Sequence, residues 1–564
     1  MFSMLPADYR HFIHWTWPQF EPYYKTLNER SLSADNVTAW LADWSHISRM
    51  VQETYSRLHV ATTLNTADAE AEKRYLTFIG EIYPQVEAAE QKLKQKLLGS
   101  GLEPAGFEIP LRNMRAEAAL FREANLPLLV ENQKRGSAYN KIIGAQTVQW
   151  DGQELTLQQI RPIAQHPDRA VRERAWRLAS DRWLADRAAI NELWTKTVPL
   201  RKQIALNAGC ADYREYRWRE MLRFDYTPAD CETFQAAIEE VAVPAANRIY
   251  ARAKQRLGVS SVRPWDCDVD RDPLSYPTLR PFENITDLME KSEEIFQHVD
   301  PQLGEYFAIM RREGLLDLDN RKGKAPGGYC TDFPVAQRPF IFMNSVGVRG
   351  DVRTMLHESG HAFHVFETNH LPYIQQLQVT MEFAEVASMS MELLAAPYLS
   401  QKFGGFYTEQ EAARDRVEHL ERIILFWPYM AVVDAFQQWA HTQPDGIDPA
   451  ACDAKWTELQ QRFMPGVDWS GLETEMMTGW QRKQHIHRAP FYYVEYGLAQ
   501  LGAVQVWRNA LKDQAMSLTN YRQALSLGGT RSLPELYEAA GVKFAFDSNT
   551  LRVAVELIKS VIAQ

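Results

Sequence analysis

The segment Leu356-His-Glu-Ser-Gly-His-Ala-Phe-His364 carries the strongest structural signal in this chain of 564 residues. His357 and His361 are four residues apart, so on a helix both imidazoles lie on one face, one turn from each other. Glu358 lies between them, where its carboxylate can take a proton from a water molecule beside a metal ion. The spacing therefore predicts a helix that carries two metal ligands and a general base.

Residues around this segment support that prediction. Gly350-Asp351 supplies a turn and an N-cap, and Pro372 stops the helix, which we expect to run from about 352 to 368. Before it, a stretch between 329 and 346 is strand-like, with Phe340-Ile-Phe-Met343 at its centre. We therefore expect a small β-sheet next to the helix.

A third metal ligand is not apparent within the segment itself. One class of metalloproteases has a third histidine six residues after the second, but that position is Glu367 here, and His364 stands where the pattern needs glycine. The best candidate is Glu385, in the segment Thr380-Met-Glu-Phe-Ala-Glu-Val-Ala-Ser-Met-Ser-Met-Glu392, which predicts a second helix capped by Thr380. Two histidines and one glutamate form a catalytic zinc set with a fourth position open for water.

Glu392 shares a helix face with Glu385, seven residues before it. It is a candidate to hold a ligand histidine by the other ring nitrogen, as carboxylates do around zinc. The alternative is an ordinary solvated helix face. Phe383 and Val386 disfavour that alternative, because they leave little obvious exposed side.

Charge and hydropathy exclude several classes of partner. The net charge is −10, which disfavours nucleic acid or an anionic membrane as the main partner. No apolar segment follows a basic start at the N-terminus, and the longest apolar run, Ile423 to Val433, has 11 residues, well short of a membrane span. We expect a cytoplasmic protein that binds neither nucleic acid nor a membrane; the sequence does not give its oligomeric state.

Most of the chain is predicted to be helical. Apolar residues recur at three- and four-residue spacing in 66–98, 114–135, 167–207 and 231–257. Two places break this pattern: the strand-like stretch between 329 and 346, and Trp150-Asp-Gly-Gln153, whose Asp-Gly pair indicates a short hairpin. Because the chain exceeds the roughly 250–300 residues at which single cores stop growing, we expect a mainly α fold with two lobes. We assign 1–200 to an N-terminal helical lobe and 201–564 to a catalytic domain.

The segments LHESGHAFH and FAEVASMSMELL resemble the M3 metallopeptidases, the group of thimet oligopeptidase and oligoendopeptidase F, and above all its shorter bacterial oligoendopeptidase F-like branch. The resemblance extends to Gly327-Gly-Tyr-Cys330, Phe340-Ile-Phe-Met-Asn344 and His485-Ile-His-Arg-Ala-Pro-Phe-Tyr-Tyr-Val-Glu-Tyr496. It implies that His357, His361 and Glu385 bind one Zn²⁺ per chain and that Glu358 is the catalytic base. It also implies two helical lobes that enclose a deep channel.

The tyrosine-rich segment has a chemical rationale of its own. Tyr493 and Tyr496 are three residues apart, so on a helix both phenols can reach one point. Hydroxyl donors of this kind stabilise the oxyanion that forms when water attacks a peptide carbonyl. The resemblance gives this role to the pair, helped by a preceding histidine. His485 is preferred over His487, and an aromatic core helix is the alternative for the whole stretch.

The loop 320–328 contains glycines and a small basic cluster. A phosphate-binding loop is disfavoured because no GK[ST] motif follows. By resemblance this region lies near bound peptide, and a strand edge there can pair with a substrate main chain. Gly327, Gly328 and Tyr329 are therefore candidate substrate contacts, together with His487.

The function predicted from these segments is zinc-dependent cleavage of internal bonds in short peptides, by a water molecule that Glu358 deprotonates. Two alternatives remain. A helical peptide-binding protein with an inactive metal site is disfavoured by the intact Glu358. A zinc exopeptidase is disfavoured because the 23 residues between His361 and Glu385 exceed the interval that is usual in aminopeptidases of this class.

Overall fold

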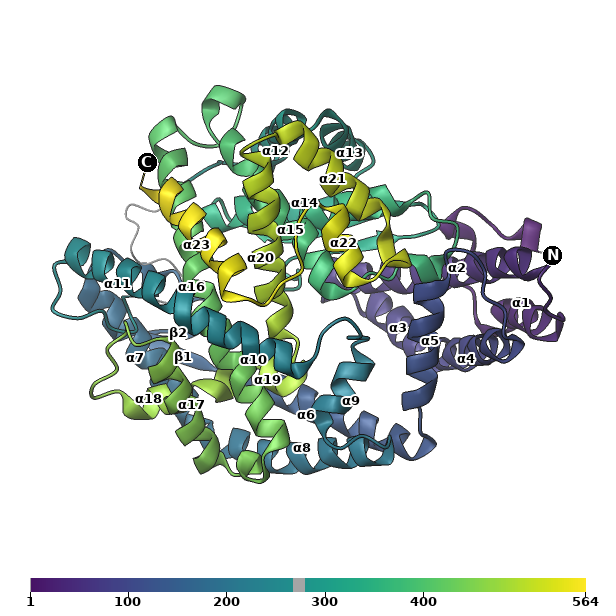
Figure 1. Ribbon diagram of the computed structural model, residues 1–564, viewed down its shortest axis with the longest axis horizontal. Coiled ribbons are helices and arrows are strands. Elements are labelled where there is room, and N and C mark those ends of the chain that lie inside the picture. Colours follow the sequence, from purple (N-terminus) through teal and green to yellow (C-terminus); the bar gives the residue numbers. More distant parts are fainter. Residues whose placement is uncertain (1, 267–278, 564) are drawn as a thin grey trace. The chain divides into compact units, whose positions relative to one another are not determined.

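The computed structural model describes residues 2–266 and 279–563, and helices make up most of them (Figure 1). This confirms the mainly α fold class. The chain folds into two compact units. Unit 1 comprises 1–118, 279–412 and 502–544, and unit 2 comprises 119–278, 413–501 and 545–564.

Unit 1 contains the helices α1 (Trp17–Glu29), α2 (Val37–Leu64), α3 (Ala69–Thr77), α4 (Tyr83–Ser100), α12 (Ile285–Val299), α13 (Pro301–Arg312), α14 (Arg349–Thr368), α15 (Met381–Ala395), α21 (Gln514–Ser526) and α22 (Leu533–Ala539). Its strands are β3 (Leu316–Asp319), β4 (Tyr329–Phe333) and β5 (Arg338–Ser345). Three helices carry the chain from one unit into the other: α5 (Glu108–Leu120), α16 (Glu409–Thr442) and α20 (Tyr493–Ala510).

Unit 2 contains the helices α6 (Leu126–Gly144), α7 (Arg169–Ala185), α8 (Arg187–Asn207), α9 (Tyr213–Glu220), α10 (Pro228–Ala237), α11 (Val243–Leu257), α17 (Pro449–Phe463), α18 (Glu473–Met477), α19 (Gln484–Arg488) and α23 (Ser548–Ile562). Its strands β1 (Thr147–Trp150) and β2 (Gln153–Thr156) form the expected hairpin. Asp151 and Gly152 turn it with φ of 49° and 82°, the left-handed pair that a tight hairpin turn requires.

The compact units do not coincide with the expected lobes 1–200 and 201–564. Residue 200 lies inside α8, and each unit is built from three separate stretches of the chain. A boundary at one point of the sequence therefore does not describe how the chain packs. The assignment of catalysis to 201–564 stays a prediction, as does the channel between lobes.

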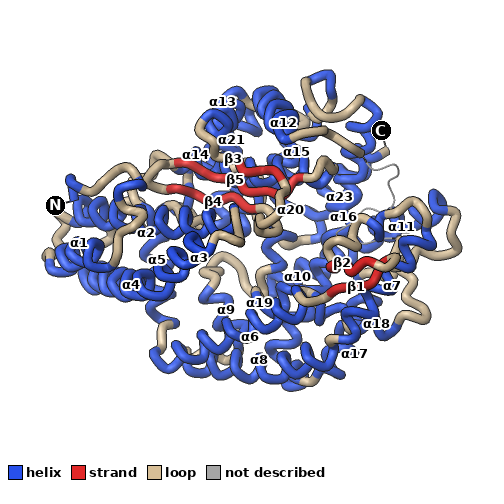
Figure 2. Tube along the Cα trace, turned by 180° about the vertical axis from the view of Figure 1, so that it is seen from behind, coloured by secondary structure: helices blue, strands red, loops and turns tan. Residues whose placement is uncertain are grey.

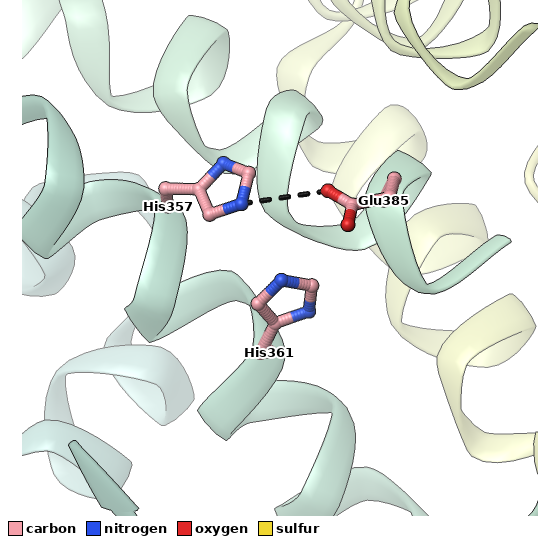
Figure 3. Close-up of side chains that lie close together, drawn as sticks. All are labelled: His357, His361 and Glu385. Atoms are coloured by element: carbon pink, nitrogen blue, oxygen red, sulfur yellow. Dashed lines mark ion pairs between the residues drawn. The ribbon is translucent and has the colours of Figure 1, made fainter. Parts of the chain in front are cut away.

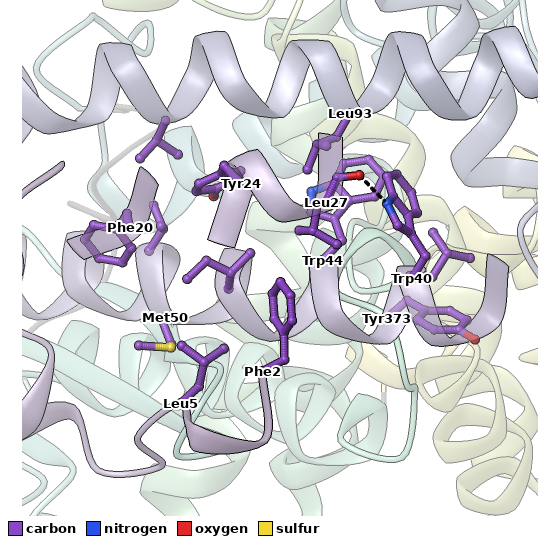
Figure 4. Packing of buried hydrophobic residues seen from close by; sticks show 14 of the residues in the cluster. Phe2, Leu5, Phe20, Tyr24, Leu27, Trp40, Trp44, Met50, Leu93 and Tyr373 are labelled. Atoms are coloured by element: carbon purple, nitrogen blue, oxygen red, sulfur yellow. Dashed lines mark hydrogen bonds between the residues drawn. The ribbon is translucent and has the colours of Figure 1, made fainter. Parts of the chain in front are cut away.

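The first helices of unit 1 pack around a large aromatic core (Figure 4). Trp40 and Trp44 of α2 are completely buried, and each indole N–H is satisfied. Trp40 donates to the carbonyl oxygen of Leu27 over 2.9 Å, and Trp44 donates to the carboxylate of Glu90 over 2.6 Å. A buried indole needs such a partner to avoid the cost of an unmade hydrogen bond.

The small sheet expected next to the helix that carries His357 and His361 is present. Its order is β3-β5-β4, with β3 parallel and β4 antiparallel to β5. Figure 2 shows the three strands side by side beside α14. β4 is an edge strand of this sheet, so its outer main-chain groups do not pair within it. Within the described ranges, no helix combines the length and apolar composition needed to cross a membrane.

Candidate metal centre

The helix that carries the two histidines begins earlier than expected. α14 starts at Arg349 instead of near 352, and it ends at Thr368 as predicted. The reason is that Asp351 is not the N-cap. It lies in the first turn, and its carboxylate accepts hydrogen bonds from the main-chain N–H groups of Val346 (2.7 Å) and Val348 (3.0 Å). α15 follows Thr380 as expected, but the Thr380 hydroxyl makes no capping hydrogen bond.

Gly360 allows α14 and α15 to lie unusually close together. A β-carbon at Gly360 would lie only 2.5 Å from the Cα of Ser388 and 2.8 Å from the carbonyl oxygen of Ala387. No other residue type fits without moving a backbone. The phenol of Tyr521 donates to the same Ala387 carbonyl over 2.8 Å. Glycine in the middle of the motif therefore sets the helix spacing on which the site depends.

The close helices bring the three expected ligands together. The ligand atoms of His357, His361 and Glu385 all lie within 4.8 Å of one another. Figure 3 shows both imidazoles projecting from α14 toward Glu385 on α15. Nε2 of His357 lies 3.4 Å from Oε2 of Glu385, and the two imidazole centroids are 5.0 Å apart. Tetrahedral zinc with bonds of about 2.1 Å needs ligand atoms about 3.4 Å apart, so the donor types and their spacing fit this ion.

A second carboxylate orients His357. Its Nδ1 lies 2.8 Å from Oε1 of Glu392, which leaves Nε2 directed at Glu385. Burial lowers the pKa of His357, but hydrogen bonds to Glu385 and Glu392 outweigh it and raise this pKa well above the ordinary value. Burial, then the charge of His357, lowers the pKa of His361 to about 4, so its ring is neutral at pH 7. Neutral imidazole is the form that binds a metal.

Glu358 is buried beside these ligands, with 8% of its surface exposed. Burial raises its pKa to about 7, although the charge of His357 lowers it. The main chain of Cys330 lies beside this carboxylate and also lowers its pKa. Cys330 belongs to the edge strand β4, so the free edge of that strand faces Glu358.

The loop before β4 is held tightly against its surroundings. A β-carbon at Gly328 would lie 3.2 Å from Cγ2 of Thr354 on α14, and the carbonyl of Gly327 accepts a hydrogen bond from Asn344 over 2.9 Å. The ring of Tyr329 stacks on Phe342 at 4.9 Å, and its hydroxyl lies 2.6 Å from that of Thr63. Tyr329 is thus a packing residue of the sheet, and only main-chain groups of this loop stay candidates for substrate binding.

The tyrosine-rich segment belongs to unit 2, where His485 joins the two tyrosines. Its ring centroid is 4.9 Å from that of Tyr493 and 6.1 Å from that of Tyr496, and the tyrosine rings are 5.7 Å apart. Lys483, which the sequence did not single out, donates to the Tyr493 hydroxyl over 2.8 Å. The sequence contains no local pattern that predicts a contact between Lys483 and Tyr493 of α20.

His487 lies elsewhere in the same unit. Its ring stacks on Tyr139 at 4.2 Å and on Trp480 at 5.8 Å, and only 6% of the residue is exposed. Burial, followed by the charge of Arg201, lowers its pKa to about 3. The preference for His485 beside the tyrosines is therefore consistent with the geometry, whereas the substrate contact expected for His487 has no exposed ring to make it.

Two models of known protein families match this sequence. The model described as "Peptidase family M3" matches residues 163–554, and the model of the "Peptidase M3 N-terminal domain" matches residues 11–105. The chain belongs to peptidase family M3. The resemblance inferred from the histidine motif is confirmed, and the match includes both the three clustered ligands and the tyrosine-rich segment.

The chain is distantly similar to curated proteins. Oligopeptidase PepF of Bacillus subtilis (strain 168) is 23% identical over 308 residues, which are 53% of this chain and 44% of that protein. An oligoendopeptidase F homolog of Mycoplasma genitalium is 23% identical over 328 residues, 55% of this chain and 50% of that protein. The chain thus matches about half the length of these relatives.

Solved M3 structures resemble the whole chain. A structure of PZ peptidase A with an inhibitor superposes with a TM-score of 0.86 and 25% identity, and the alignment covers 100% of this chain and 99% of that one. Oligoendopeptidase-F from Enterococcus faecium gives a TM-score of 0.57 at 14% identity, over 97% of this chain and 96% of that one. The second likeness concerns the fold alone.

Proposed function

We propose that this chain is a zinc-dependent oligoendopeptidase that hydrolyses internal bonds of short peptides. The observation that carries the proposal is the convergence of His357, His361 and Glu385 within 4.8 Å, with the buried carboxylate of Glu358 on the same helix as the histidines. Membership of the M3 family supports it.

In this proposal His357, His361 and Glu385 hold the ion, and Glu392 keeps the His357 ring oriented through Nδ1. A zinc ion held there supplies a Lewis acid for the scissile carbonyl and lowers the pKa of the attacking water. Glu358 accepts the proton of that water and then donates it to the leaving amine. In this proposal the proton transfer occurs next to a strand edge, because Glu358 lies beside Cys330 of β4.

Substrate binding is proposed at that edge. An extended peptide can add to β4 as a further strand, with main-chain hydrogen bonds that do not depend on side chains. The main chain of Gly327 and Gly328, which directly precede β4 in the sequence, is proposed to contribute to the same binding surface. Tyr493, Tyr496 and His485 are proposed to stabilise the oxyanion, as hydroxyl donors do in other acyl-transfer sites. The proposal includes a recessed site, which would select short, unstructured peptides.

The variant Glu358→Gln tests the proposal. Because the amide keeps the shape but accepts no proton, we expect zinc to stay near one per chain and kcat to fall by about 10³-fold or more. Glu367→Gln is the matched control, because Glu367 lies on the same helix and pairs with Arg522 over 2.7 Å, away from the ligands. Turnover of Glu358→Gln within about tenfold of the wild type would exclude Glu358 as the base.

A second measurement separates the alternatives. Quenched peptides with blocked termini report internal cleavage, whereas dipeptide reporters with a free amino group report exopeptidase activity. We expect turnover of the blocked peptides only, and only in the zinc-loaded protein. Binding of peptides without turnover would favour a peptide-binding protein with an inactive site.

A further inference from the structure

A cavity of about 330 Å³ adjoins the metal centre within unit 1. Its wall includes Cys330 and Asp332 of β4, His361 and Thr368 of α14, and Arg49 of α2. It therefore begins at a proposed zinc ligand and follows the C-terminal half of the edge strand. A cavity in this place adjoins any peptide that lies along β4.

Arg49 is the one arginine or lysine side chain among the described residues that line this cavity. Its Nη2 donates to the carbonyl oxygens of Leu371 (2.9 Å) and Pro372 (3.3 Å), which orients the guanidinium. Its Nε is buried and has no hydrogen-bond partner within the described part of the chain. Burial lowers the pKa of this guanidinium, but arginine stays protonated at neutral pH.

No acidic side chain of the described residues forms an ion pair with Arg49. Asp332 lines the same cavity, but burial raises its pKa and so favours its neutral form. The nearby carboxylate of Glu53 is already occupied by Arg57 at 2.8 Å and by the main-chain N–H groups of Val335 and Ala336. A partly buried cation without a counterion is unfavourable, so a carboxylate entering the cavity gains a charge-assisted bond.

The direction of β4 indicates which part of a peptide reaches the cavity. Cys330 lies opposite Glu358, and Asp332 follows it along the strand. Antiparallel addition is the more common way for a strand to pair with an edge. A peptide that runs antiparallel to β4 lays residues N-terminal to the cleaved bond over the Asp332 end, where the cavity lies.

We propose that Arg49 makes this cavity a subsite for an acidic side chain, located N-terminal to the cleaved bond. The proposal rests on the proposed endopeptidase function, because it names a substrate preference of that same site. The bound carboxylate completes the hydrogen bonding of the guanidinium, which the chain itself leaves incomplete at Nε.

The test uses blocked peptides that differ only in carrying Glu, Gln or Lys at one of the three positions before the cleaved bond. We expect wild-type kcat/KM to be about 10-fold higher for the best Glu peptide than for its Gln counterpart. In Arg49→Gln this ratio falls to about 1, and Arg49→Lys keeps part of it. Because this quantity is the ratio of kcat/KM for two peptides, a general loss of activity does not change it. Arg122→Gln is the control, since Arg122 also donates to main-chain carbonyls but does not line the cavity.

Binding gives a readout that needs no turnover. In the Glu358→Gln background, fluorescence anisotropy with labelled peptides should show the same Glu preference in Kd, and Arg49→Gln should remove it. A wild-type Glu-to-Gln ratio near 1, with both peptides cleaved, overturns the subsite and leaves the proposed function intact. A preference for Lys overturns it in favour of Asp332.

Two further outcomes complete the test. If the preference that depends on Arg49 follows the C-terminal carboxylate and disappears with C-terminal amides, the assignment to a side chain before the cleaved bond is wrong. If no peptide is cleaved by the zinc-loaded wild type while Glu-selective binding persists, the proposed function fails and the carboxylate site stands.

Discussion

Two pairs of largely buried histidines have opposite surroundings in this chain. In unit 1, His357 lies between the carboxylates of Glu385 and Glu392 and next to His361. In unit 2, His441 and His487 lie among aromatic rings beside the fully buried Arg201, whose Nη1 is 3.4 Å from Nε2 of His441.

The pairs differ in burial, since the His357 side chain is 25% exposed whereas His441 is only 8% exposed, but the larger difference lies in the neighbours. Carboxylates raise the pKa of His357, whereas burial and then Arg201 lower the pKa of His441 well below its ordinary value. A histidine that faces carboxylates is arranged to bind a cation together with them. A buried histidine that faces an arginine and aromatic rings is a neutral core residue. The following predictions test this contrast, from the largest expected effect to the smallest.

Removing a proposed ligand in unit 1 should abolish metal binding. Removing a core histidine of unit 2 should leave metal binding unchanged. His357→Ala and Glu385→Ala are each expected to reduce zinc from about one per chain to near zero after dialysis. His487→Ala should retain the metal. Elemental analysis of the dialysed proteins measures this. Glu382→Ala is the matched control, because Glu382 is a buried acid of the same helix. Tight metal in Glu385→Ala, with loss in Glu382→Ala, would show that the ligand is misassigned.

If the tyrosine cluster stabilises the transition state, its removal should lower kcat. Tyr493→Phe or Tyr496→Phe should lower kcat by about 10²–10³-fold with little change in KM, as for other oxyanion donors. Steady-state kinetics on one quenched peptide measures both constants, and Tyr492→Phe is the control. Normal turnover combined with a lower melting temperature would instead identify the cluster as core packing.

Glu392 tests the contrast between histidines beside carboxylates and histidines beside an arginine. It is not one of the three proposed ligands, but it contacts His357. Glu392→Gln keeps an acceptor oxygen near Nδ1 but removes the charge. We expect zinc affinity about 10–100-fold weaker, with the metal still bound at saturating zinc. Competition with a chelator gives the affinity. An unchanged Kd would mean that His357 is positioned by the helix alone.

The core pair predicts a dependence of stability on pH. His487 has a pKa of about 3 in the folded chain, and about 6.5 is expected when it is unfolded. Above pH 6.5 the ring is neutral in both states. As the pH falls toward 3, only the unfolded chain gains the proton, so the free energy of unfolding drops by up to about 1.4 kcal/mol per pH unit.

His487→Phe keeps a ring in the stack and removes this proton. In urea unfolding of the metal-free proteins at pH 7, 6 and 5, the variant should therefore lose less stability with acidification than the wild type. Parallel curves for the two proteins would contradict a neutral core role for His487.

The sequence predicted the parts of the site that depend on short-range periodicity. The four-residue spacing of His357 and His361 fixes their common face on any helix, and the segment of Glu385 is itself regular enough to be recognised. The start of α14 was predicted three residues late, because a first-turn aspartate and an N-cap aspartate look alike in sequence. The choice between His485 and His487 needed the structure, since only tertiary packing places one ring beside the tyrosines and the other in a core.

Long-range features were not predictable from local pattern. Arg49 comes about 300 residues before His361, and nothing around it marks a cavity. The division into two compact units also depends on long-range contacts. Each one joins distant stretches, and α8 runs through the expected boundary without a break.

The three-part construction of unit 1 has a consequence for the newly made chain. His357 and Glu385 are translated well before Tyr521, whose hydrogen bond to Ala387 helps to hold α15 in place. At about 5–20 residues per second, the ribosome needs on the order of ten to thirty seconds to pass from Glu385 to the end of the last stretch of unit 1, at residue 544. Zinc uptake is therefore expected to follow the synthesis of this last stretch of unit 1. A chain truncated near residue 501 should bind zinc more weakly than the chain of 564 residues.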